Sequence, residues 1–109
     1  MGARQVWSLQ EALMLPVVWL AEAAADLEEA RKWYEDIRPE IGERFALAVD
    51  SAIRAISTNP LQFPAVYRDR RRAGVRRFPY GVFFEVQEQR IVVIACFHGR
   101  RNPKRQESR

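Results

Sequence analysis

The hydrophobic period changes once along this chain, and that change limits what it can fold into. Between residues 22 and 56 apolar side chains recur every three or four positions, whereas from residue 74 to 98 they alternate or run without a break. The first spacing is typical of amphipathic helices and the second of strands. Because an apolar helix face is buried well against a sheet, the sequence predicts a two-layer α+β fold.

Two helices are expected in the first region, the clearest over residues 22–37. Arg38 precedes Pro39, which disfavours helical geometry at Arg38 and suits the first turn of a second helix. The second helix should end before Asn59 and Pro60. So short a connection between the two helices predicts an antiparallel hairpin.

Strands are expected on both sides of this hairpin. A short buried strand is predicted at residues 17–20, and a loop over residues 59–73 should lead to strands at residues 74–78, 80–86 and 90–98. The last of these is apolar on both faces, as in a central strand. The predicted architecture is an N-terminal strand, an antiparallel helical hairpin and a three-stranded antiparallel meander.

The length of 109 residues predicts one domain. We expect this domain to span residues 15–103, between a poorly ordered extension at residues 1–14 and a basic tail at residues 104–109. Translation from Met1 and translation from Met14 are both open. A secretory signal is disfavoured, because Pro16 interrupts the apolar run that such a signal would need.

Composition excludes several classes of protein. The chain has one cysteine, Cys96, and one histidine, His98, so an internal disulfide and a zinc module are ruled out. We expect no metal and no cofactor. No apolar stretch approaches the roughly 20 residues that span a bilayer, which excludes an integral membrane protein.

Charge is sorted along the chain. Residues 1–67 carry six basic and ten acidic side chains, whereas residues 68–109 carry twelve basic and four acidic ones. The basic residues are almost all arginines, which bind phosphate and carboxylate through two parallel hydrogen bonds. The C-terminal part should therefore present a basic surface to an anionic partner, either nucleic acid or an acidic protein.

Two motifs then carry a family resemblance. An arginine-bearing strand leads into an aromatic-rich strand over residues 75–86, and an apolar strand closes on the sequence HGRRNP at residues 98–103. With the helical hairpin, this order resembles the RelE/ParE toxin superfamily of type II toxin–antitoxin, or plasmid-stabilisation, systems. The resemblance implies a cytoplasmic growth inhibitor that an adjacently encoded antitoxin neutralises. RelE-like members cut messenger RNA on the ribosome, whereas ParE-like members poison DNA gyrase.

Candidate site residues follow from these two activities. RNA cleavage needs a proton donor and cations on the phosphate, which His98 and Arg100 would supply. His98 has a structural alternative, a strand-end histidine held by a backbone carbonyl. Target binding would use Arg76, Arg77, Arg100 and Arg101, with the adjacent Arg76 and Arg77 on opposite faces of a strand.

The chain departs from the RelE-like pattern, because no tyrosine follows Tyr80 and its strands lack lysine. We therefore favour a ParE-like toxin that binds gyrase. The alternatives are a ribosome-dependent endoribonuclease and a non-toxic basic binding module. Among other residues, Glu85 is a candidate base, Cys96 should be buried and Trp33 exposed. The run Arg68, Arg70, Arg71 and Arg72 should form a solvated loop.

Overall fold

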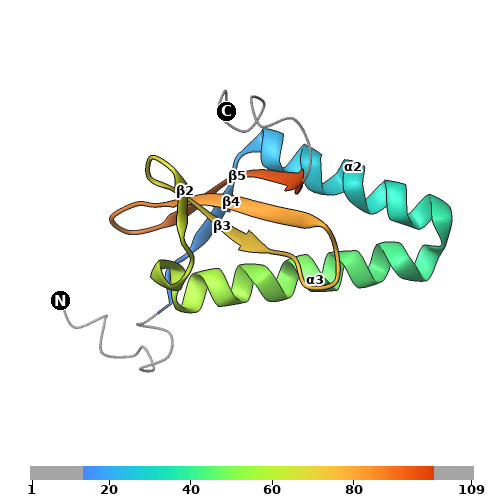
Figure 1. Cartoon of the computed structure of the whole chain (residues 1–109), viewed down its shortest axis with the longest axis horizontal. Coiled ribbons are helices and arrows are strands. Elements are labelled where there is room, and N and C mark those ends of the chain that lie inside the picture. Colours follow the sequence, from blue (N-terminus) through green and yellow to red (C-terminus); the bar gives the residue numbers. More distant parts are fainter. Residues whose placement is uncertain (1–13, 100–109) are drawn as a thin grey trace.

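The computed structural model describes residues 14–99, which form an α+β fold with a helical hairpin against one face of a sheet (Figure 1). The predicted fold class is thereby confirmed, and the extension and tail predicted at the two ends lie almost entirely outside the described residues. The elements are β1 Val17–Trp19, α2 Ala21–Ile37, α3 Pro39–Thr58, the 3₁₀ turn η2 Pro60–Gln62, β2 Ala65–Tyr67, β3 Arg70–Gly74, β4 Tyr80–Val86 and β5 Ile91–His98.

The two helices are joined through a single residue, Arg38. Its backbone is extended, with φ −157° and ψ 137°, and Pro39 opens α3, as the sequence predicts. The helices pack closely where Gly42 faces α2. A Cβ atom at Gly42 would lie 2.9 Å from the Glu35 Cβ and 3.1 Å from the Arg31 carbonyl oxygen. The absence of a side chain there permits the tight antiparallel hairpin.

The sheet has the strand order β1-β5-β4-β3-β2. β1 runs parallel to β5, with Val17 opposite Ile91 and Trp19 opposite Val93. The other pairings are antiparallel, so the meander contains four strands where the sequence predicted three. β5 lies between β1 and β4, in agreement with its apolar character. β1 is only half-buried, although a buried strand was predicted there.

The loop predicted over residues 59–73 is wrong, because this segment contains η2, β2 and β3. A two-residue turn at Arg68 and Asp69, with Arg68 at φ 51°, joins β2 to β3. The strand predicted at residues 74–78 is also wrong, since β3 ends at Gly74 and the chain then turns into β4. Long polar side chains conceal the alternation in β3, where buried Ala73 alone marks the inner face.

An aromatic cluster fixes the hairpin to the sheet. The fully buried Phe45 of α3 has its ring centroid 5.2 Å from that of Tyr34 and 5.1 Å from those of Phe78 and Tyr80. These four rings come from both helices, the β3–β4 turn and β4. The rest of this core consists of apolar side chains from the helices and from the helix-facing sides of the strands, including Ala23, Ala30, Val49, Ile56, Ala73, Val82, Phe84, Ile91, Val93 and Cys96.

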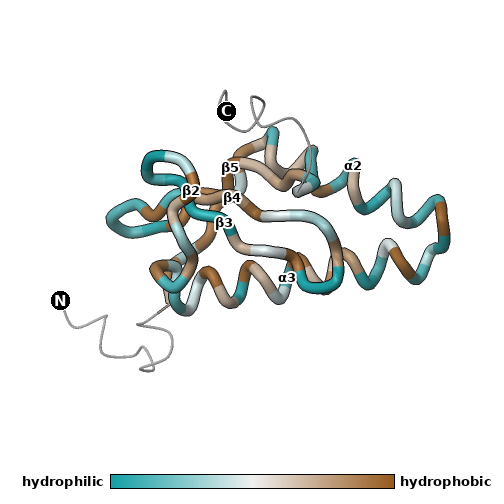
Figure 2. The backbone as a smooth tube through the Cα atoms, in the orientation of Figure 1, coloured by the Kyte–Doolittle hydropathy of each residue, from teal (hydrophilic) through white to brown (hydrophobic). Residues whose placement is uncertain are grey.

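A second apolar cluster lies on the other face of the sheet. It consists of Phe83 from β4 and Val92, Ile94, Ala95 and Phe97 from β5, all nearly inaccessible to solvent. A shift of register between Phe83 and Phe84 adds one residue to β5 and keeps both faces apolar. Figure 2 shows the contrast between hydrophobic central strands and hydrophilic hairpin tips.

Phe45→Ala should lower the free energy of unfolding by about 3–5 kcal/mol, because it removes three ring contacts and leaves a cavity. Leu47→Ala, at an exposed position of the same helix, should change it by less than about 0.5 kcal/mol. Urea unfolding followed by circular dichroism measures both. Equal losses in the two variants would contradict the assigned core.

Candidate functional site

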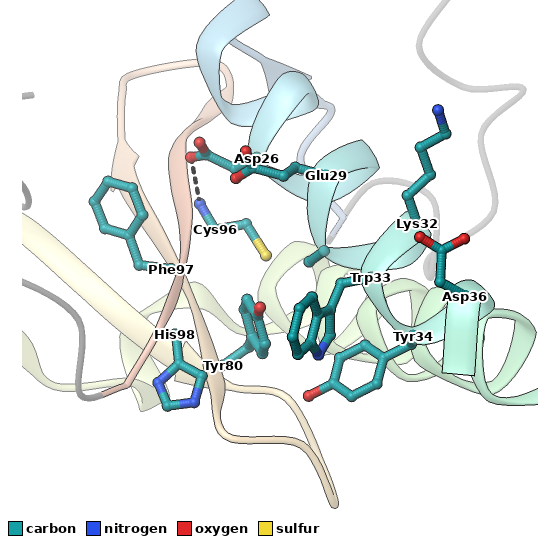
Figure 3. Close-up of a pocket in the computed structure, with 11 residues that line it drawn as sticks. Asp26, Glu29, Lys32, Trp33, Tyr34, Asp36, Tyr80, Cys96, Phe97 and His98 are labelled. Carbon is teal, nitrogen blue, oxygen red and sulfur yellow. Dashed lines mark hydrogen bonds between the residues drawn. The ribbon is translucent and has the colours of Figure 1, made fainter. Parts of the chain in front are cut away.

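A cleft of about 470 Å³ lies between α2 and the end of β5 (Figure 3). It exists because β1 pairs with β5 only as far as Val93, which leaves the later part of that edge without a strand partner. α2 passes this open edge and supplies one wall. The lining residues are Asp26, Glu29, Ala30, Lys32, Trp33, Tyr34 and Asp36 from α2 and Tyr80, Cys96, Phe97 and His98 from the sheet.

Asp26 ties the helix to the open edge of β5. Its Oδ2 accepts a hydrogen bond of 3.1 Å from the Cys96 backbone N–H, as drawn in Figure 3. Asp26 is 9% exposed, so its carboxylate lies in the interior. A carboxylate in this position takes the place of a neighbouring strand's carbonyl, which satisfies a buried backbone donor.

The cleft combines acidic and aromatic side chains. The carboxylates of Asp26, Glu29 and Asp36 outnumber the one lysine, Lys32, in its lining. Burial raises the pKa of the Tyr34 hydroxyl, and Trp33 is 64% exposed, which confirms the exposure predicted for it. The described lining of the cleft is thus mainly acidic and aromatic.

His98 lies at the end of β5, as predicted, and lines this acidic cleft. Its ring meets that of Tyr80 edge-on, with centroids 5.4 Å apart. Both side chains are on the helix-facing side of the sheet, because Tyr80 belongs to the core beneath the hairpin. Arg100 and Arg101, which were predicted to stand beside His98, lie outside the described residues.

The arginines of β3 do not line this cleft. Arg70 and Arg72 are paired with Glu85 and Phe83 of β4, on the face away from the helices. Arg70 Nε lies 3.4 Å from Glu85 Oε2, so the candidate base Glu85 is held in an ion pair. Arg71, on the other side, donates a hydrogen bond to the Phe63 carbonyl oxygen. The solvated loop predicted for this run is therefore wrong.

Arg76 and Arg77 occupy the turn between β3 and β4 and not the strand predicted for them. Both are exposed, and Arg77 has a left-handed backbone with φ 71°. Arg76 lines a shallow depression against α3 with Gly74 and Ala73. The prediction that Arg76 and Arg77 lie on opposite faces of a strand is therefore wrong.

The described residues divide the candidate chemistry between two faces. His98 and the cleft carboxylates lie on the helix side, whereas Arg70 and Arg72 lie on the far side of the sheet. Within residues 14–99, no three His, Cys, Asp or Glu side chains are grouped so that they could hold a metal ion. No helix in this part of the chain is long and apolar enough to cross a membrane.

Comparison with known proteins identifies the family of this chain. The model of the ParE toxin of type II toxin–antitoxin systems, parDE, matches residues 17–103. The chain belongs to the ParE toxin family. It is 31% identical over 84 residues to Toxin ParE2 from two strains of Mycobacterium tuberculosis, CDC 1551 / Oshkosh and ATCC 25618 / H37Rv. The match covers 76% of this chain and 80% of each relative.

A solved structure has the same fold. The chromosomal ParDE TA system from P. aeruginosa contains a chain that matches with a TM-score of 0.69 at 20% identity. The match covers 78% of this chain and 96% of that chain. Together with the family match, this fold confirms the resemblance to the ParE-like branch.

Sequence reasoning did not identify two features of this ParE family member. Nothing in the sequence singles out Asp26, because its partner Cys96 lies 70 residues away along the chain. The strand position of Arg70 and Arg72 was concealed by neighbouring charges. The sequence signal for a strand here was the alternation of side chains, with Arg71 and the buried Ala73 on the helix-facing side.

Cys96 should make the protein less stable at high pH. Burial raises the pKa of its thiol from 9.0 to about 12, and the Asp26 carboxylate adds to the rise. Because the folded state holds this proton more tightly, the stabilisation is complete below about pH 9 and is lost as pH rises toward 12. The slope for one proton reaches at most about 1.4 kcal/mol per pH unit.

Urea unfolding between about pH 8 and 10 measures this slope, and Cys96→Ala should make it shallower. Identical slopes in the two proteins would contradict the raised thiol pKa. As an independent check, the wild-type thiol should react with a disulfide reagent only after unfolding.

Proposed function

We propose that this protein is a bacterial toxin that arrests growth by binding DNA gyrase in the cytoplasm and that a cognate antitoxin neutralises it. Membership of the ParE toxin family supports the class of activity. The choice of gyrase rests on one observation: His98 is on the opposite side of the sheet from Arg70 and Arg72. The chain is thus proposed to act by binding and not by hydrolysis.

RNA cleavage would require a different arrangement. A general acid must reach the leaving oxygen while cations contact the same phosphate. Here His98 lines a cleft whose described lining contains three carboxylates and one lysine, whereas the arginines of β3 lie on the opposite face of the sheet. The described part of the chain therefore favours a protein target over messenger RNA.

An antitoxin partner is part of the proposal. The solved relative from P. aeruginosa is described as a ParDE TA system, a toxin together with its antitoxin. The basic C-terminal part of this chain suits a small acidic protein, since opposite charges speed and orient association. We expect the gene for such a protein to lie beside the gene for this chain.

Purified protein should inhibit supercoiling of relaxed plasmid by gyrase. His98→Ala should change that inhibition by less than about twofold, because the histidine is not proposed to touch the target. If the chain were instead a ribosome-dependent nuclease, loss of its general acid would lower cleavage by roughly 10²–10⁴-fold. Supercoiling and ribosome-bound mRNA cleavage are assayed side by side with both proteins.

Cleavage of mRNA that His98→Ala abolishes would overturn the gyrase proposal in favour of the endoribonuclease. Normal bacterial growth at good expression, with neither activity, would favour a non-toxic basic binding module. Growth arrest that co-expression of the neighbouring acidic protein relieves would support the toxin and its antitoxin.

A further inference from the structure

Arg72 has an unusual position on the far face of the sheet. Its guanidinium lies over Gly81 of β4, with Cζ 5.9 Å from the centroid of the Phe83 ring. A Cβ atom at Gly81 would overlap Nε and would lie 2.7 Å from Cζ and 2.9 Å from Nη2. The arginine therefore fills the space that a side chain at Gly81 would take.

Two further glycines, Gly74 and Gly99, lie beside the guanidinium. Gly74 stands directly opposite Gly81 in the β3–β4 ladder, and a Cβ atom there would lie 3.7 Å from Nη1. A Cβ atom at Gly99 would lie 3.5 Å from Nη2. Arg72 is half-buried, and its guanidinium packs against these glycine positions.

Within residues 14–99 the structure records no hydrogen bond or ion pair for this guanidinium. Glu85, an acidic residue on the same face of the sheet, is paired with Arg70. Partial burial of a cation without a counterion costs free energy, and an anion that approaches the exposed edge of the group recovers it. Since the guanidinium is already positioned, little side-chain entropy is lost on binding.

We infer that Arg72 is a preformed docking point for a carboxylate side chain of a protein partner. A guanidinium that lies beside an aromatic ring without a hydrogen-bond partner has its N–H groups available, and a carboxylate accepts two of them in parallel. A nucleic acid is a poorer fit, because it needs several cations in a row. On these strands the charge of Arg70 is compensated, and Glu85 would repel a chain of phosphates.

The inference deepens the proposed function, on which it rests only for the identity of the partner. A test on the full chain follows the Arg Nε–Hε resonances of ¹⁵N-labelled protein by NMR, with Arg72→Gln to assign the Arg72 signal. The probes are a tetraglutamate peptide, inorganic phosphate and a short oligo(U) RNA. The peptide should shift the Arg72 signal in a saturable manner, and neither phosphate nor RNA should match its affinity.

Gly81→Ala keeps every charge but displaces the Arg72 guanidinium from its position over residue 81, so it should weaken peptide binding roughly tenfold or more. Gly74→Ala is the matched control, since its Cβ atom meets Arg72 only at ordinary contact distance and should leave affinity within about twofold. Circular dichroism verifies that both variants fold.

Three results would overturn the inference: no saturable shift with the peptide, tighter binding of RNA than of peptide, or equal affinity in Gly81→Ala and the wild type. A failure of the proposed function gives a different outcome. In that case the peptide still shifts the Arg72 signal and Gly81→Ala still weakens it, while gyrase supercoiling proceeds normally in the presence of the wild-type protein.

Discussion

Strand β5 sets the constraint on which the rest of the molecule depends. Every residue from Ile91 to Phe97 is buried, so both faces and both edges of this strand must be covered. The helical hairpin covers one face, and Phe83 packs against Phe97 on the other, with ring centroids 6.0 Å apart. β4 covers one edge along its length, while β1 and then Asp26 cover the other. The helical hairpin, β1 and β4 thus each cover part of β5, while β2 and β3 extend the sheet beyond β4.

The same constraint separates the chemistry of the two faces. Side chains at the helix-facing positions of β5 end at His98, which enters a cleft whose acids come from α2. Side chains of β3 that face away from the hairpin are Arg70 and Arg72, on the opposite surface. The acids of the cleft come from α2, which passes the open edge of β5, whereas β3, nearer the other edge of the sheet, carries arginines. The charge asymmetry of the sequence thus becomes an asymmetry of faces.

Sequence reasoning succeeded where apolar side chains alone determine an element. The helical hairpin, β4 and β5 follow from periodicity and from Pro39, and their burial agrees with it. It failed at β2 and β3, because arginine has a long apolar stem that lies along a sheet while its charge makes the segment look solvated. Buried polar contacts were equally out of reach, since the Asp26–Cys96 hydrogen bond depends on how the helix crosses the finished sheet.

Glycine in a strand weakens a sheet, so a facing pair such as Gly74 and Gly81 is costly unless something uses the space. In this molecule the guanidinium of Arg72 fills the space beside Gly81. The guanidinium of Arg72 lies over Gly81 of β4, with its Cζ 5.9 Å from the centroid of the Phe83 ring. One side chain thereby fills the space over Gly81 and presents a positive charge beside the second apolar cluster. The stability of the far face and its capacity to recognise an anion then depend on the same contact, so a change at Gly81 reaches both.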